Sequence, residues 1–139
     1  MIMSQKKQSV CTADAAAEVI RAILNAGETH DLGKEHFYAI GLNTKNIVQY
    51  VELVSLGSLN ACIVHPREVF RFACIKGIAA LIIAHNHPSG DTAPSQEDIL
   101  LTKRLAQAGE VLGIKVLDHV IVGEEKTFFS FRDKGLINP

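Results

Sequence analysis

Two histidines and one aspartate are spaced in this sequence as ligands of a catalytic metal ion would be. His85 and His87 stand two residues apart, so in an extended backbone their side chains point to the same side. Pro88 follows directly and favours an extended conformation at His87. Asp98 falls in the first turn of a predicted helix that starts at Ser95, close to the histidines. Two imidazoles and one carboxylate make a three-ligand zinc site with an open fourth position, which is typical of catalytic zinc.

Plainer interpretations exist for parts of this pattern. Ser95 and Asp98 have the Ser-x-x-acidic spacing of a helix capping box, which taken alone favours a purely structural role. Residues 85–87 spell His-Asn-His, but the nuclease motif of that name spreads its residues over a larger ββα-metal unit, so the tripeptide is a weak signal. Two histidines followed by an acidic helix start together favour the metal site.

The elements around these residues predict where the site lies. Residues 78–84 form a continuous apolar run that is typical of a central strand buried on both faces. A turn-rich loop over 85–94 follows, and residues 95–112 read as an amphipathic helix that ends at Gly113. Open α/β sheets bind ligands at the carboxyl ends of their strands, which is where the histidines fall.

The rest of the chain alternates helices and strands, which predicts an α/β protein. We expect helices over 12–27 and 67–76, a hairpin of strands 36–42 and 47–56 around the turn 43–46, and further strands over 59–64, 115–122 and 127–131. Residues 1–11 read as a short polar tail, and residues 12–139 as one domain.

The chain length and the net charge limit the classes of function that the protein can have. The chain has 139 residues, the size of one domain, and a net charge of −1. A protein that neutralises phosphates usually shows a basic excess, so the composition argues against a dedicated DNA-binding module.

Cysteine usage and hydropathy indicate the cellular compartment of the protein. Cys11, Cys62 and Cys74 form no close pair, and the last two stand in apolar stretches, so we expect buried, reduced thiols. The N-terminus resembles no secretory signal, and the longest apolar run is too short for a bilayer span, which predicts a cytoplasmic protein with no membrane partner.

The combined motif resembles a known family. His85-x-His87, seven residues, then Ser95-x-x-Asp98 is the pattern of the JAMM (MPN+, JAB) metalloproteases. More narrowly, the chain resembles the JAB domain of bacterial RadC proteins, in segments that include 42–46, 64–69, 85–90, 117–119 and 134–137. The resemblance implies a cytidine-deaminase-like α/β/α sandwich with a mixed sheet. Full-length RadC proteins begin with a helix-hairpin-helix region, so we expect a short, domain-only member here.

The resemblance also implies roles. It assigns Zn2+ to His85, His87 and Asp98, and it makes Ser95 the donor to the oxyanion. Nine glutamates could act as general base and spacing cannot choose among them, but the JAMM base matches Glu35. Glu68 is the competitor, although a helix-surface pair with Arg71 explains it more simply. His119 reads as a buried, hydrogen-bonded histidine rather than a ligand.

These observations favour a zinc-dependent hydrolase, a metallopeptidase or isopeptidase acting on a peptide or protein substrate. The alternative is a DNA-repair or prophage-associated accessory protein that acts by binding without hydrolysis. A metal-dependent nuclease is a third hypothesis, which the balanced charge disfavours. DNA is not expected as a direct tight partner, and exposed strand edges would suit a homodimer.

Overall fold

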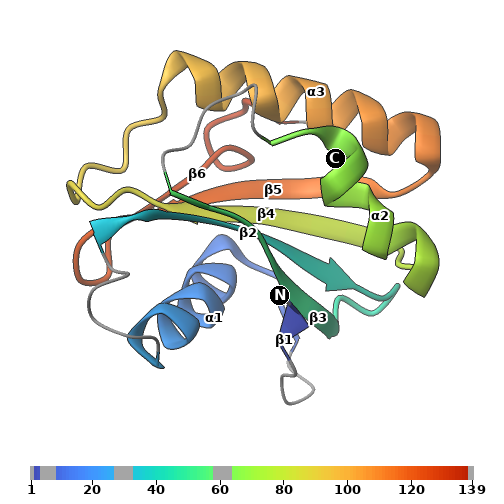
Figure 1. The fold of residues 1–139 in the computed structure, drawn as a ribbon, viewed down its shortest axis with the longest axis horizontal. Coiled ribbons are helices and arrows are strands. Elements are labelled where there is room, and N and C mark those ends of the chain that lie inside the picture. Colours follow the sequence, from blue (N-terminus) through green and yellow to red (C-terminus); the bar gives the residue numbers. More distant parts are fainter. Residues whose placement is uncertain (1, 4–8, 27–32, 58–63, 138–139) are drawn as a thin grey trace.

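One mixed sheet forms the centre of the molecule, with helices on both of its faces (Figure 1). The computed structural model describes residues 2–3, 9–26, 33–57 and 64–137. The strands are β1 (Ile2–Met3), β2 (Glu35–Leu42), β3 (Val48–Gly57), β4 (Ala80–Asn86), β5 (Lys115–Val122) and β6 (Phe128–Ser130), and their order in the sheet is β1-β3-β2-β4-β5-β6. The pair β4–β5 is parallel and the other pairs are antiparallel.

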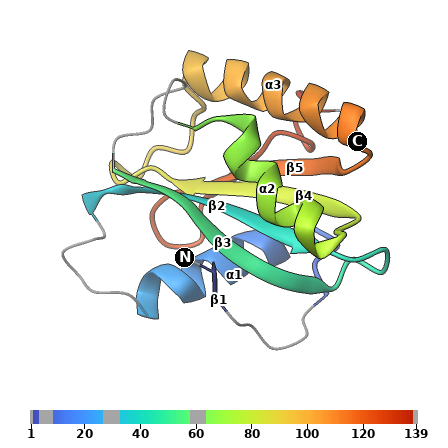
Figure 2. The same cartoon turned by 45° about the vertical axis from the view of Figure 1, so that its right-hand side comes forward.

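Helix α1 (Ala13–Ala26) covers one face of the sheet, and α2 (Pro66–Lys76) and α3 (Gln96–Leu112) cover the other (Figures 1 and 2). This arrangement confirms the predicted α/β/α sandwich. Within the described part of the chain, no helix has the length and apolar character to cross a membrane.

Strand β4 is buried along its whole length and separates two cores. Ile82 and Ala84 pack in the core that contains α1, whereas Leu81 and Ile83 pack in the core under α2 and α3. Because side chains alternate along a strand, the next residue, His85, faces the side of α2 and α3. It stacks there on Phe37 of β2.

Most of the predicted elements are confirmed. The first helix, the hairpin β2–β3, α2 with proline in its first turn, α3 and β5 all lie where the sequence predicts them. Strand β4 starts and ends two residues later than predicted, so His85 and Asn86 close the strand rather than open the loop. The strand predicted over 59–64 lies almost wholly outside the described residues. The pairing of β1 with β3, inside the predicted tail, was not expected.

The expected burial of Cys74 is wrong. Cys74 is exposed on α2, because the helix turns Val69, Phe70 and Ala73 toward the sheet and leaves Cys74 facing outward. Cys11 is also exposed, and Cys62 lies outside the described residues.

The backbones of α3 and β5 lie very close together at the end of the helix. Gly113 has a φ of 74° and caps the helix, and the Ile114 N–H donates to the Gly109 carbonyl at 2.9 Å. A Cβ atom at Gly109 would lie 2.3 Å from the Ile114 carbonyl oxygen. The missing side chain therefore lets β5 return directly beneath α3.

We expect Gly109→Ala to destabilise the protein, although alanine is normally the better helix former. The added methyl forces the α3–β5 junction apart, at a cost of about 1–3 kcal/mol, as is typical of overpacking. Urea denaturation measures the change. Gln107→Ala, at an exposed position of the same helix, is the control and should change the stability little. A Gly109→Ala protein more stable than wild type would contradict the close approach.

Candidate metal centre

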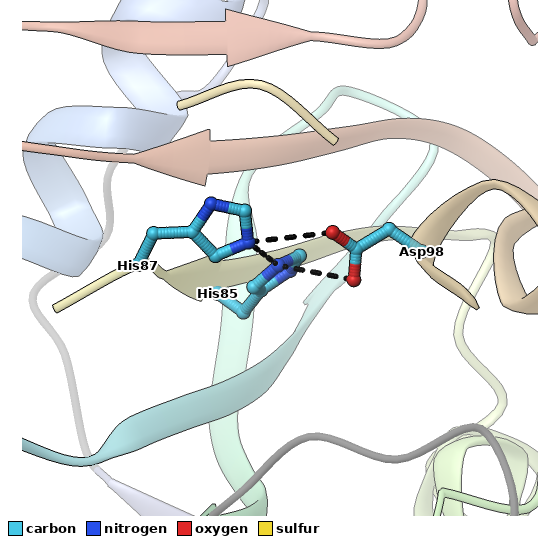
Figure 3. Close-up of side chains that lie close together, drawn as sticks. All are labelled: His85, His87 and Asp98. Carbon is cyan, nitrogen blue, oxygen red and sulfur yellow. Dashed lines mark hydrogen bonds and ion pairs between the residues drawn. The ribbon is translucent and has the colours of Figure 1, made fainter. Parts of the chain in front are cut away.

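Three side chains meet where β4 ends and α3 begins (Figure 3). The Nε2 atoms of His85 and His87 are 3.1 Å apart. The Asp98 carboxylate places Oδ1 3.4 Å from His85 Nε2 and Oδ2 3.3 Å from His87 Nε2. His85 and Asp98 are buried, and His87 is partly exposed. The structure thus brings together the three residues that the spacing predicts as ligands.

These separations fit a tetrahedral metal ion. Ligand atoms about 2.0–2.1 Å from a zinc ion stand about 3.3 Å from one another when the coordination is tetrahedral. The 3.1 Å between the two Nε2 atoms matches one edge of such a tetrahedron, and each Nε2 atom lies about one edge length, 3.4 or 3.3 Å, from a different oxygen of Asp98. One ligand atom from each of the three residues lies within 4.8 Å of the others, so the cluster could hold a metal ion.

A backbone carbonyl fixes the proton on His87. The Nδ1 atom of His87 lies 2.7 Å from the carbonyl oxygen of Asp91. A carbonyl oxygen only accepts, so Nδ1 must carry the hydrogen. In the neutral ring, Nε2 then presents its lone pair to His85 and Asp98.

A second carbonyl fixes the proton on His85 through a buried chain of hydrogen bonds. The Thr102 hydroxyl donates to the Asp98 carbonyl at 2.7 Å, so its oxygen accepts from His119 Nδ1 at 2.6 Å. His119 Nε2 is then the acceptor for His85 Nδ1 at 2.7 Å. Burial lowers the pKa of His119 well below its usual range and keeps this ring neutral. His85 therefore also presents an Nε2 lone pair to the cluster.

The backbone carbonyls of Asp91 and Asp98 thus fix the same tautomer in both histidines, with the Nε2 atoms facing the centre of the site. Two nitrogen lone pairs and one carboxylate face a common point, and their mutual repulsion is relieved only by a positive charge between them. A metal ion bound between them would supply that positive charge. In the metal-free protein, a proton on one of the rings would supply part of it. A histidine ligand whose other ring nitrogen donates to a fixed acceptor is the usual pattern at metal sites.

Asp98 has two roles because of its place in α3. The Ser95 hydroxyl oxygen accepts from the Asp98 N–H at 3.0 Å, and Asp98 Oδ2 accepts from the Ser95 N–H at 2.9 Å. The predicted capping box is therefore present. It folds the carboxylate back over the start of the helix, where the helix dipole favours negative charge. The cap aims Asp98 at the two imidazoles, so the structural and the metal-binding interpretations are compatible.

A cleft of about 360 Å³ opens beside the cluster. Glu35, Ser95 and Glu97 line it together with His87, Asp98 and the loop residues Pro88 and Ser89. The two further residues that the resemblance implicates, Glu35 and Ser95, therefore lie next to the cluster. The competing Glu68 is exposed in the first turn of α2.

The charges of the cluster shift the pKa values of its members. Burial alone would raise the pKa of Asp98, but the close contacts of its carboxylate with the His85 and His87 rings hold it well below its usual range. The pKa of His87 is raised, mainly by its hydrogen bond with Asp98 and to a lesser extent by Glu35. The Glu35 carboxylate is therefore close enough to act electrostatically on His87.

Two residues that support the site are not among the predicted site residues. Thr102 was not singled out, although it follows Asp98 by four residues and shares a buried stripe with Leu101 and Leu105. A polar residue on an apolar stripe was the available signal. Asn86 was treated only as part of a tripeptide, but its amide bonds to the backbone of residues 34 and 36. His119 is confirmed as a buried, hydrogen-bonded histidine.

The sandwich and its His-His-Asp cluster define an α/β domain of the JAB/MPN kind, and the cluster is compatible with a JAMM site. The chain belongs to the RadC-like JAB domain family, which matches residues 10–136. It is 56% identical over 110 residues to a UPF0758 protein of Desulforamulus reducens, covering 79% of this chain and 48% of that protein. It is 57% identical over 106 residues to a UPF0758 protein of Geobacillus kaustophilus, covering 76% of this chain and 46% of that protein. The chain therefore spans about half the length of the curated relatives it matches.

The raised pKa of His87 predicts a pH dependence of the metal-free protein. The folded state holds this proton more tightly than the unfolded chain, so the pair with Asp98 stabilises the fold fully below about pH 6.5 and loses its effect as the pH rises through the folded-state pKa. The lowered pKa of Asp98 adds stability above about pH 3.9 that is lost in acid.

We expect the pKa of His87 to fall in Asp98→Asn, because the carboxylate that stabilises the imidazolium is gone. An NMR titration of the His87 ring in chelator-treated protein measures it. Glu97→Gln, a neighbouring acid in the same turn, is the control and should leave the pKa of His87 almost unchanged. An equal shift in both variants would mean that general negative charge, rather than contact with Asp98, raises it.

Proposed function

We propose that this domain is a zinc-dependent hydrolase of the JAMM type, a metallopeptidase or isopeptidase. One observation carries the proposal: the Nε2 atoms of His85 and His87 lie 3.1 Å apart and each lies within 3.4 Å of an Asp98 carboxylate oxygen, with both imidazoles held in the tautomer that leaves Nε2 facing the cluster. His85, His87 and Asp98 would hold the ion and leave one coordination position open toward the cleft. This is the ligand count of catalytic zinc sites.

When bound, zinc supplies a Lewis acid that makes water more acidic and polarises an amide carbonyl. The protein supplies the groups that move protons. The Glu35 carboxylate lines the same cleft as His87 and would take a proton from water and return it to the leaving nitrogen. The Ser95 oxygen accepts from the Asp98 N–H, so its own hydrogen can be donated to the carbonyl oxygen as negative charge develops there.

The charge of the cleft supports a peptide rather than a nucleic acid as substrate. Glu35, Glu97 and Asp98 bring three negative charges to its lining, one more than a zinc ion would neutralise, and no Lys or Arg among the described lining residues is present to bind phosphate groups. A neutral peptide, or an isopeptide bond reached through the aliphatic part of a lysine side chain, needs no such cationic residue. The proposed partner is therefore a peptide or protein.

We expect about one zinc ion per chain in protein purified without added metal, and weaker binding in His87→Ala by more than about 100-fold, since losing a ligand costs more than losing an outer-shell partner. Elemental analysis and chelator competition measure both. Glu97→Ala, which removes a nearby acid but none of the three ligands, is the control. A wild type that neither contains nor takes up metal would contradict the site.

We expect Glu35→Gln to bind zinc like the wild type but to hydrolyse about 100–10,000-fold more slowly, because it removes the general base and keeps its shape. The substrates are a mixture of linear and lysine-isopeptide-linked peptides, with cleavage followed by mass spectrometry. Glu97→Gln is the matched control in the same cleft and should retain activity. Wild-type rates in Glu35→Gln would exclude Glu35 as the base. A zinc-loaded wild type that cleaves nothing would favour the accessory protein that acts by binding.

We expect His119→Phe to weaken zinc binding about 10–100-fold, as is typical when an outer-shell partner of a metal ligand is lost. Phenylalanine keeps the stacking on Phe131, with ring centroids 4.6 Å apart, but it cannot accept from His85. Chelator competition measures the affinity. His65→Phe is the control, because that ring caps α2 and makes none of the cluster's hydrogen bonds. Unchanged affinity in His119→Phe would show that the buried chain does not hold His85.

A further inference from the structure

We infer that Asn86 is a positioning residue that holds Glu35 opposite the metal cluster. Asn86 stands between the two histidines in sequence, but its side chain forms hydrogen bonds with the backbone at the start of the neighbouring strand, β2. This inference rests on the proposed role of Glu35 and adds how the chain fixes that carboxylate in place.

The backbone pairing of β2 with β4 stops just before the site. The last paired residues are Phe37 and His85. Beyond this pair of residues, the His87 N–H donates to the Val122 carbonyl of β5 at 3.0 Å, so the chain after β4 stays paired with β5 and not with β2. The two strands therefore part between Glu35 and His87, which is where the cleft lies.

The Asn86 side chain connects β2 and β4 at the point where the two strands separate. Its Oδ1 accepts from the His36 N–H at 2.5 Å, and its Nδ2 donates to the Lys34 carbonyl at 3.1 Å. These two backbone groups flank Glu35 on either side. The primary amide thus takes the place of a peptide group of a neighbouring strand and continues the pairing for one more step.

Few side chains can make this bridge. It requires one donor and one acceptor on the same short, planar group, which is the amide of asparagine at this reach. Asn86 is buried, and its hydrogen bond with the His36 N–H is shielded from water, whereas the one to the Lys34 carbonyl is partly shielded. Glu35 is the first residue of β2 and is paired with Gly57 of β3 on one side, and without the bridge its backbone loses the hydrogen bonds on the other side, which faces the site. A misplacement of about 1 Å in a catalytic group can cost about 100-fold in rate.

The test compares Asn86→Ala with Asn43→Ala in the full chain. Asn43 is the matched control, because its Oδ1 also accepts from two backbone N–H groups, those of Lys45 and Ile47, at the other end of β2. The first measurement is amide hydrogen exchange of His36 by NMR in chelator-treated protein, which requires neither metal nor substrate. The second is zinc affinity by chelator competition, and the third is kcat and KM on the peptide mixture.

We expect Asn86→Ala to raise the exchange rate of the His36 amide about tenfold or more, as the loss of one buried hydrogen bond allows. Zinc affinity should stay within about threefold of wild type, whereas kcat should fall about 10–100-fold with little change in KM. Asn43→Ala should change none of these. Asn86→Asp keeps an oxygen for the His36 N–H but loses the donor to Lys34, so it should protect the His36 amide and lose less activity than Asn86→Ala.

Two results would overturn the inference: unchanged His36 exchange in Asn86→Ala, or a loss of zinc affinity as large as in His87→Ala, which would place the action of Asn86 on the ligands. If Asn86→Ala does not fold, Asn86→Asp decides the matter, since an unprotected His36 amide there would contradict the bridge. A wild type without zinc or hydrolysis would refute the proposed function, but the exchange rate of His36 would still decide whether Asn86 holds this backbone.

Discussion

Two backbone carbonyls, those of Asp91 and Asp98, determine the chemistry of this site because they cannot donate a hydrogen bond. The first places the hydrogen of His87 on Nδ1, and the second does so for His85 through Thr102 and His119. Both Nε2 lone pairs are consequently aimed at the Asp98 carboxylate. The site is set up for a cation by the positions of its protons, and the surrounding fold serves to hold those two carbonyls and the rings between them.

The sheet topology supplies these parts at one end of β4. The parallel neighbour β5 carries His119 on the face that meets α3, and the buried stripe of α3 brings Thr102 above it. The close contact of Gly109 with Ile114 sets the distance between these two elements. On the other side of β4, the antiparallel β2 delivers Glu35. Three neighbouring strands and one helix therefore each contribute to a single cluster and its cleft.

The sequence predicted what depends on local spacing. The period of a strand places His85 and His87 on one side, and the first turn of a helix places Asp98 near them, so the three candidate ligands and most elements could be found without the structure. Glu35 came only from the resemblance, because its proximity depends on strand order. The roles of Asn86 and Thr102 do not follow from local spacing, because Asn86 bonds to backbone groups at the start of β2 and Thr102 bonds to the side chain of His119 on β5. The burial expected for Cys74 was wrong because apolar neighbours in sequence do not fix which face of a helix a residue occupies.

The central claim, that His85, His87 and Asp98 hold a catalytic zinc ion, is tested most directly by X-ray absorption at the zinc edge of the zinc-loaded protein. We expect four nitrogen or oxygen neighbours at about 2.0–2.1 Å, with the outer-shell scattering of two imidazole rings. A sulfur neighbour at about 2.3 Å would instead assign the zinc to a cysteine such as the exposed Cys11 or Cys74. That result, or a spectrum without imidazole scattering, would contradict the account.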